Sequence, residues 1–203
     1  GADSQDKPCP DGVPVISRDG EFLGAATVPV ISRDGQLLAA AKGPRLRVWS
    51  RTNEGRWELR FDGAFDDDLG DEPGAPSAGR DRITRLALSS ASNQLAAGGE
   101  SGRIRFLDIR DGKPAARFRT ASVDAGSRVT ALLFLADGSG LLSGGIDGIV
   151  AQWSLPALRK VASSERHQRG VSGLALADRA KGGFEGRPAL VSADRGGAIL
   201  EWS

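Results

Sequence analysis

The sequence predicts an all-β protein built from four repeated units of short strands. The first observation is a sequence motif, the recurring phrase, of which the chain has four copies at spacings of 46 to 58 residues. It consists of an apolar run, small residues, a glycine turn, and alternating apolar positions that end in Trp or Leu. The copies are Leu38–Ser50, Leu95–Asp108, Leu141–Ser154 and Leu190–Ser203. A period of this length is typical of blade-type repeats, in which each unit is one small sheet.

The second observation is an alternating apolar run ahead of each copy, which predicts a further strand. Its matched positions in successive units are Ile83, Leu86 and Leu88; Val129, Leu132 and Phe134; and Val171, Leu174 and Leu176. Turn residues such as Asp137-Gly138 separate this run from the recurring phrase. A more polar run after three of the copies predicts a solvated outer strand, at 56–61, 115–119 and 160–164. The last copy closes the sequence without one.

The third unit carries the clearest turns, with Asp137-Gly138 and Asp147-Gly148 on either side of a Ser/Gly-rich strand and Trp153 at the end. It resembles the WD40 repeat, and in-register repetition extends the resemblance over roughly residues 28–203. The departures are a terminal Trp-Ser in place of Trp-Asp and the near absence of a Gly-His pair. The resemblance implies a β-propeller of WD40 type. About four four-stranded blades are visible, as part of a larger or oligomerically completed ring.

The remaining segments predict the domain organisation. Residues 1–12 are expected to form a flexible N-terminal tail, and residues 13–203 the partial propeller. Residues 13–27 and 28–42 agree at 11 of 15 positions, so 13–42 is a duplicated hairpin. The first copy is either a broken blade or a pair of closing strands. Residues 62–80 are rich in Asp, Gly and Pro, which predicts an insertion loop. A calcium-binding loop is disfavoured, because the carboxylates do not follow the ligand order of an EF-hand.

The only histidine, His167, lies four residues before Val171. WD40 blades place a histidine there that hydrogen-bonds across the blade. The resemblance therefore implies a structural hydrogen-bond network of His167 with Ser192, Asp194 and Trp202. The competing interpretation is a Ser-His-Asp triad, which requires an accessible histidine and a reactive serine.

Arginines stand just before the first strands of three successive units, at Arg82, Arg128 and the Arg169-Gly170 pair. In propeller geometry this position opens on the same face as the turns that hold Asp147 and Arg195. These five residues predict a partner-binding arc that receives an acidic segment through bidentate guanidinium contacts. The alternative is that each arginine forms a weak surface ion pair with a neighbouring acid.

Composition narrows the function classes. The chain of 203 residues has 27 basic and 26 acidic residues, which argues against bulk capture of nucleic acid. No apolar stretch reaches the length of a membrane span, so no membrane partner is expected. No GxSxG, Walker A loop, HExxH motif or cysteine pair occurs, so we expect no catalytic residue, metal or cofactor. Usage rich in Arg, Ala, Gly and Asp suggests a high-GC bacterial source. We expect the protein to be cytoplasmic.

The family resemblance implies a non-catalytic, protein-binding scaffold or sensor. We expect it to be the regulatory portion of a larger bacterial signalling protein. The alternative is an enzyme or a small-ligand-binding propeller with its site in the central channel. Four blades are few for a WD40 ring, and an open half-ring exposes apolar faces and strand edges. The rest of a parent chain, self-association or another subunit is therefore expected to complete the ring.

Overall fold

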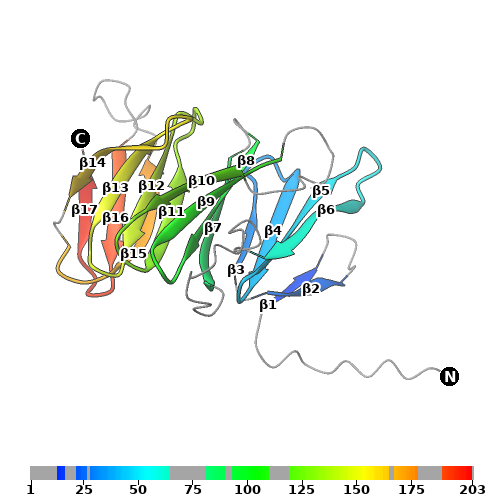
Figure 1. The fold of residues 1–203 in the computed structure, drawn as a ribbon, viewed down its shortest axis with the longest axis horizontal. Helices are drawn as coiled ribbons and strands as arrows, with labels where there is room; N and C mark the ends of the chain where they lie inside the picture. The colour runs from blue at the N-terminus through cyan, green and yellow to red at the C-terminus, as the bar shows by residue number, and fades with distance from the viewer. Residues whose placement is uncertain are drawn as a thin grey trace, which may run out of the picture.

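The computed structural model describes residues 13–16, 22–26, 28–64, 81–89, 93–109, 119–164, 167–177 and 189–202. These residues form 17 strands and no helix (Figure 1). The strands make three four-stranded sheets, one three-stranded sheet and one two-stranded sheet. Every strand pair is antiparallel. The all-β class predicted from the repeat is confirmed.

Each repeat unit forms one sheet, which we call a blade, and consecutive strands are neighbours within it. Blade 1 consists of β3 (Val28–Ile31), β4 (Leu37–Lys42), β5 (Arg45–Arg51) and β6 (Trp57–Ala64). Blade 2 consists of β7 (Ile83–Ser89), β8 (Gln94–Gly99), β9 (Arg103–Asp108) and β10 (Arg119–Asp124). Blade 3 consists of β11 (Val129–Phe134), β12 (Gly140–Gly145), β13 (Val150–Ser154) and β14 (Arg159–Ser164). Blade 4 consists of β15 (Val171–Ala177), β16 (Ala189–Asp194) and β17 (Ile199–Trp202).

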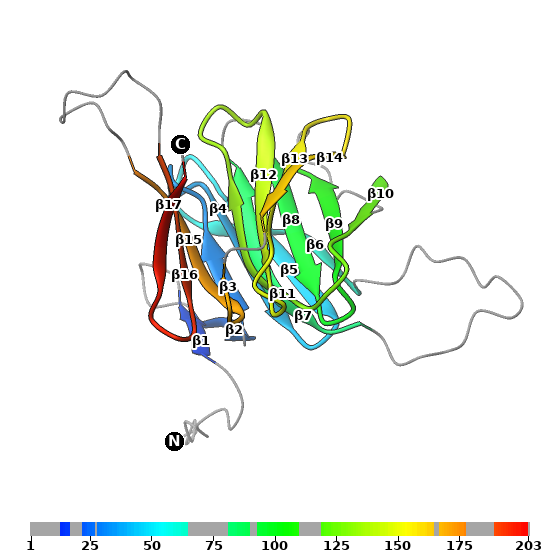
Figure 2. The same ribbon diagram turned by 90° about the vertical axis from the view of Figure 1, so that its left-hand side faces the viewer.

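The blades stand side by side in the order of the sequence. The first strand of each blade packs against the blade before it: β7 contacts β3 and β4, β11 contacts β7 and β8, and β15 contacts β11 and β12. Figure 1 shows blades 1 and 4 at opposite ends of this row, and Figure 2 shows the row from the blade 4 end. The described strands therefore form an open arc in which β3, β7, β11 and β15 are the inner strands.

The hydrophobic core lies between neighbouring blades, where their flat faces meet. The cluster between blades 1 and 2 includes Leu46, Val48, Ile83, Leu95 and Leu107. The cluster between blades 2 and 3 includes Ile104, Phe106, Val129, Leu141 and Trp153. A smaller cluster between blades 3 and 4 includes Val150, Val171, Leu174, Leu190 and Trp202. Burial of this apolar surface is what holds one blade to the next.

The first copy of the duplicated segment forms a separate hairpin. Its two strands pair in almost the same register as the first two strands of blade 1. In β1 (Val13–Ile16) and β2 (Phe22–Ala26), Val13 lies opposite Ala26, just as Val28 lies opposite Ala41 in β3 and β4. A shift after Val15 changes only the last pair. The hairpin is a separate sheet that contacts β3 and β4 (Figure 1). It therefore stacks beside blade 1 and does not add strands to it.

Two boundaries differ from the sequence-based expectations. The insertion loop is expected from residue 62, but β6 continues to Ala64. Asp62 Oδ2 accepts a hydrogen bond from Arg47 Nε at 3.0 Å, which keeps the strand paired with β5. Of the outer strand expected at 115–119, only Arg119 is described, and it begins β10. The tail at 1–12 and residues 65–80 of the expected loop lie outside the described residues.

The inner strands of blades 2, 3 and 4 share a bulge near their start. The extra residue carries a hydroxyl that donates to a carbonyl oxygen of the second strand, at 3.0 to 3.2 Å; these residues are Thr84, Thr130 and Ser172. A bulge changes the direction of the side chain that follows it. The residues that follow are Arg85, Ala131 and Gly173.

Candidate functional site

The structure brings His167, Ser192, Asp194 and Trp202 together inside blade 4. His167 Nε2 lies 2.6 Å from Ser192 Oγ, and Trp202 Nε1 donates to the same oxygen at 2.8 Å. His167 Nδ1 lies 3.4 Å from Asp194 Oδ2, which is an electrostatic contact and too long for a well-formed hydrogen bond. The Ser192 hydroxyl on β16 thus connects His167, which precedes β15, with Trp202 at the end of β17.

The turn between β16 and β17 holds Asp194 in place. Its Oδ1 accepts hydrogen bonds from the backbone N–H groups of Gly196 at 2.8 Å and Ala198 at 3.0 Å. Burial acts to raise the pKa of the Asp194 carboxyl, but these hydrogen bonds and His167 outweigh it, so the pKa lies below its usual value. The folded state therefore favours the ionised carboxylate.

The lowered pKa of Asp194 predicts how the free energy of unfolding depends on pH. A carboxyl whose pKa is lower in the folded state stabilises the fold above its unfolded pKa, here 3.8. That contribution is lost as the pH falls through the folded value. We expect the difference in unfolding free energy between wild type and Asp194→Asn to be constant above about pH 5 and to narrow below the usual Asp pKa. Urea unfolding across this range measures it, and a difference that stays constant down to the acid limit would contradict it.

The contacts of His167 with Ser192 and with Asp194 also match the connectivity of a Ser-His-Asp triad. A nucleophilic serine must reach a substrate, however, and Ser192 is 0% exposed. The side chain of His167 is also 0% exposed. A hollow of about 330 Å³ lies beside the network, and the described residues that line it are Gln168, Arg169, Asp194, Gly196, Ala198 and Leu200. Because Ser192 and His167 are not among them, the geometry supports a structural role.

Blade 3 contains part of the same arrangement, which the sequence analysis missed. Trp153 Nε1 donates to Ser143 Oγ at 2.8 Å, the bond that Trp202 makes to Ser192. The ten-residue spacing between serine and tryptophan is the same in both blades and was available as a signal. In blade 2 the matched positions hold Ala97 and Leu107, which cannot make this bond.

The predicted arginines lie at the start of the inner strands. Arg82 and Arg128 occupy equivalent positions, because the backbone carbonyl of each accepts the N–H of a turn residue at 3.0 Å. In blade 4 that position is Gly170, where a Cβ atom would lie 2.9 Å from the carbonyl oxygen of Ile146. Arg169 therefore stands one position earlier than Arg82 and Arg128 do in their blades, in keeping with the Arg169-Gly170 pair of the sequence. Its Cδ lies against Gly196.

We call the exposed residues Arg82, Arg128, Arg169 and Arg195 the arginine face. Arg128 Nη2 lies 3.7 Å from Glu100 Oε1, and both side chains are nearly half exposed, so this pair is weak. The other three members form no ion pair with a described residue. Asp147 is also exposed, but its Oδ1 accepts the N–H of Ile149 at 3.1 Å and so supports its own turn.

A further arginine belongs to this region and was not predicted. Arg85 is exposed, whereas its neighbours Thr84 and Leu86 are buried. Burial, and then the positive charges of Arg128 and Arg195, lower the pKa of the Arg85 guanidinium. The positive charges that act on the Arg85 guanidinium of blade 2 therefore come from blades 3 and 4. No local pattern predicts a role for Arg85 here, because an arginine in an alternating strand is expected to point outward.

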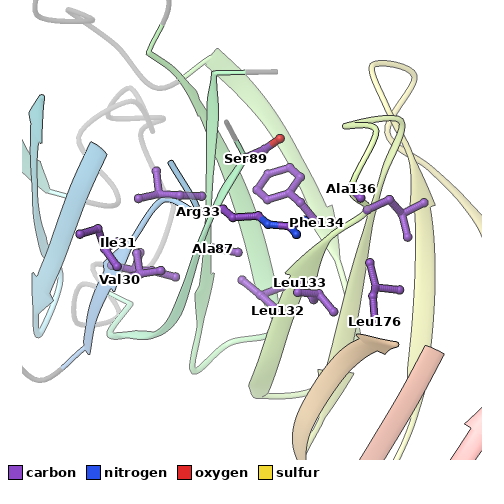
Figure 3. Close-up of a pocket in the computed structure, with 13 residues that line it drawn as sticks. Val30, Ile31, Arg33, Ala87, Ser89, Leu132, Leu133, Phe134, Ala136 and Leu176 are labelled. Carbon is purple, nitrogen blue, oxygen red and sulfur yellow. The ribbon is translucent and has the colours of Figure 1, made fainter. Parts of the chain in front are cut away.

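A larger hollow, of about 420 Å³, lies at the other end of the inner strands (Figure 3). Its lining comes from all four blades and is mostly apolar; it includes Val30, Leu88, Leu132, Phe134 and Leu176. Arg33 is the only charged residue among the described lining, and Figure 3 shows it between Ile31 and Phe134. The inner side of the arc thus has a basic end and an apolar end.

Among the described residues, no group of three or more His, Cys, Asp or Glu side chains is placed to hold a metal ion. No helix among these residues is long and apolar enough to cross a membrane.

Comparison with protein families gives a match over blade 3. Residues 116–154 match the family described as WD domain, G-beta repeat. The chain contains a WD40 repeat. The matched range includes β10, the outer strand of blade 2, and the first three strands of blade 3. A WD40 repeat in the sequence therefore spans two blades, which links neighbours through the chain as well as through their packed faces.

Solved structures give the same fold. A chain of the crystal structure of the mitotic checkpoint complex matches with a TM-score of 0.64 at 18% identity, over 88% of this chain and 49% of that chain. The computationally designed Ika4 protein matches with a TM-score of 0.59 at 18% identity, over 94% and 98%. The designed Ika8 protein matches with a TM-score of 0.60 at 18% identity, over 91% and 49%.

These comparisons confirm the partial WD40-type propeller predicted from the sequence. The chain spans about half the length of the checkpoint-complex chain and of Ika8, and nearly all of Ika4. At this level of identity the likeness establishes the fold alone. No curated protein matches the sequence.

Proposed function

We propose that the chain is a non-catalytic protein-binding module, a scaffold or sensor within a larger bacterial signalling protein of the cytoplasm. WD40 propellers are typically interaction scaffolds, because rigid blades present many loops on one face. The observation that supports this function best is the arginine face. It combines four exposed guanidinium groups from three neighbouring blades with a single weak ion pair among the described residues.

The partner would present an acidic segment to this face. Arginine binds carboxylates through two parallel hydrogen bonds, which adds geometric specificity to the charge attraction. Glu100 would have to release Arg128, at small cost because that pair is exposed. Asp147 would disfavour acidic side chains near its own turn and so help to set the register of the partner.

The blade 4 end of the arc supports the proposal that further chain or another subunit completes the ring. Ile199 on β17 is 71% exposed. This strand belongs to blade 4, an end blade of the row. A large exposed apolar side chain on an end blade of an open row of sheets is a surface that an added blade would cover. The rest of a parent chain, a second copy or another subunit could provide it.

Substitution of the arginine face tests the proposal. We expect Arg82→Gln, Arg128→Gln and Arg169→Gln together to weaken binding of a fluorescently labelled Glu-rich peptide by roughly tenfold or more. The salt dependence of binding should also become shallower, because fewer charges are neutralised. Fluorescence anisotropy at several salt concentrations measures both effects.

The control removes three exposed arginines elsewhere, with Arg45→Gln, Arg56→Gln and Arg159→Gln. This variant has the same net charge as the first and should bind almost as wild type does. Equal affinities of the two triple variants would reject the arginine face as the interface.

The apolar hollow favours a second candidate, a propeller that binds or converts a small ligand in its channel. Its size and mostly apolar lining are typical of small-molecule sites, and Arg33 could bind a carboxylate there (Figure 3). Arg33→Gln separates the two candidates. Loss of peptide binding on this substitution, with the arginine face intact, would favour the channel.

A further inference from the structure

The three interfaces between neighbouring blades repeat one arrangement. A small residue on the second strand of a blade lies opposite a large apolar residue on its third strand: Ala41 and Leu46, Gly98 and Ile104, Gly144 and Val150. The large residues are at most 5% exposed. Each shares an apolar cluster with the residue that begins the inner strand of the next blade: Ile83, Val129 or Val171. We call each small and large pair a seat, because it receives that residue.

Blade 4 has a fourth seat, and this one is open to solvent. Ala193 on β16 lies opposite Ile199 on β17, in the position of the three other pairs. Ile199 is 71% exposed, whereas its counterparts in blades 1, 2 and 3 are buried. The same arrangement that receives an inner strand three times within the chain is therefore exposed at the end of the row.

The turn beside the seat shows the same difference. A Cβ atom at Gly102 would lie 2.8 Å from Ser127 O, and one at Gly148 would lie 2.4 Å from His167 O. The backbone that enters blade 3 or blade 4 thus crosses the turn of the blade before it. Gly197 has the same turn hydrogen bond and a similar positive φ. Beyond its chain neighbours, no atom lies within 4 Å of the place of its Cβ.

Ala193 selects how a strand can enter the open seat. In blades 2 and 3 the small residue is glycine, and a Cβ atom there would lie 2.5 Å from Cγ1 of the valine that the seat receives. Ala193 carries such a Cβ atom, as Ala41 does in blade 1. Ala41 is 1% exposed and belongs to the same cluster as Ile83. The open seat therefore suits a strand placed as β7 is on blade 1.

A second copy of this chain is not placed to provide that strand. Its β7, β11 and β15 already pack against the blades before them, and its β3 and β4 contact the β1–β2 hairpin (Figure 1). One residue separates β2 from β3 in the sequence, so the hairpin stays at blade 1. Leu38 and Ala40 alternate with the residues that face blade 2, and both are buried even so. The row is covered at blade 1 and open at blade 4.

We propose that the seat of blade 4, formed by Ala193, Gly197 and Ile199, binds the first hairpin of a WD40-type blade from another polypeptide. The incoming inner strand begins with a branched apolar residue such as isoleucine, which packs on Ala193 and Ile199. Its backbone crosses the turn at Gly197. This inference rests on the proposed completion of the ring, and it names the surface and the partner that complete it.

The test adds a cyclic peptide of residues 81–99 to the full chain. This segment contains β7 and β8, and cyclisation offsets the low stability of an isolated hairpin. The methyl resonance of Ile199 should shift and saturate in an NMR titration. A cyclic peptide of residues 126–145, which contains β11 and β12, should bind about tenfold more weakly, because its Val129 would meet the Cβ atom of Ala193.

Variants of both partners define the contact. Ile199→Asp in the full chain and Ile83→Asp in the peptide should each weaken binding by about tenfold or more, because a carboxylate would enter an apolar contact without a partner. Ala193→Gly should strengthen binding of the 126–145 peptide. Val161→Asp is the matched control, because Val161 is 56% exposed on the outer strand β14, and this variant should bind as wild type does.

Three outcomes bear directly on the seat. Absence of a shift at Ile199 with both peptides, or equal affinities of the wild-type and Ile199→Asp chains, would overturn it. Light scattering should show a monomeric full chain; a dimer that Ile199→Asp dissociates would show that a second copy fills the seat, which also overturns the proposal. If the peptides fail to bind while the Glu-rich peptide still depends on Arg82, Arg128 and Arg169, the proposed function stands without this seat.

Discussion

Trp153→Ala is expected to lower the free energy of unfolding by about 3 to 5 kcal/mol. Trp153 is 4% exposed and belongs to the apolar cluster between blades 2 and 3, with Ile104, Phe106 and Val129. Alanine would leave a cavity at the face where these two blades meet. It would also leave the buried Ser143 hydroxyl without its 2.8 Å donor, which adds an unsatisfied polar group to the loss of packing.

Trp153→Phe separates the two contributions. Phenylalanine retains most of the packing but has no N–H, so we expect a smaller loss of about 1 to 3 kcal/mol. Urea unfolding followed by circular dichroism measures both variants. Trp57→Ala is the matched control, because Trp57 is only partly buried against the smaller cluster of Leu38, Ala40 and Trp49. If Trp57→Ala destabilises as much as Trp153→Ala, the interface between blades 2 and 3 is not the dominant core.

The hairpins and inner strands could be predicted from the sequence because their signals are local. Alternation places Leu86 and Leu88 on one face of β7, and both contact the cluster with blade 1. Turns with glycine at positive φ, such as Gly138 and Gly148, occur where the repeat predicts them. At Gly148 an added Cβ would lie 2.4 Å from the carbonyl oxygen of His167, so the turn also needs glycine for the close approach of the next blade.

The bulges could not be predicted, and the site depends on them. A bulge inserts one residue into a strand, and in the sequence it looks like an ordinary break in alternation. At Thr84 the side-chain hydroxyl lies within hydrogen-bonding distance of the carbonyl oxygens of Gly98 and Val129, which are 14 and 45 residues away. The direction of Arg85 follows from that bulge. The contact of Thr84 with Val129 joins two blades, and no local pattern in the sequence contains it.

The offset of Arg169 follows from the repeat frame. Matching Val171 with Val129 places Gly170 opposite Arg128, so Arg169 lies one position earlier. The backbone of Ile146 leaves no room for a side chain at position 170. The residues of the His167 network also follow the repeat frame, and the structure places them within hydrogen-bonding or ion-pair distance of one another.

His167→Ala is expected to lower the free energy of unfolding by about 1 to 3 kcal/mol, through the polar groups that it leaves unsatisfied. Ser192 would lose its 2.6 Å partner in a position with no access to water, and Asp194 would lose the cation or dipole beside it. Gln168→Ala is the matched control. It changes the exposed neighbour and should leave the unfolding free energy within about 0.5 kcal/mol of wild type.

A double-mutant cycle of His167→Ala and Ser192→Ala distinguishes the structural network from a triad. Because the two side chains share one hydrogen bond, the double variant should lose less stability than the sum of the single variants, with a coupling of about 0.5 to 3 kcal/mol. Any binding activity should survive in the folded fraction. A catalytic pair would behave in the opposite way, with an activity lost equally in all three variants while the melting temperature stays unchanged. That outcome would require an opening of blade 4 that exposes Ser192, because its hydroxyl is enclosed by His167 and Trp202 in the structure.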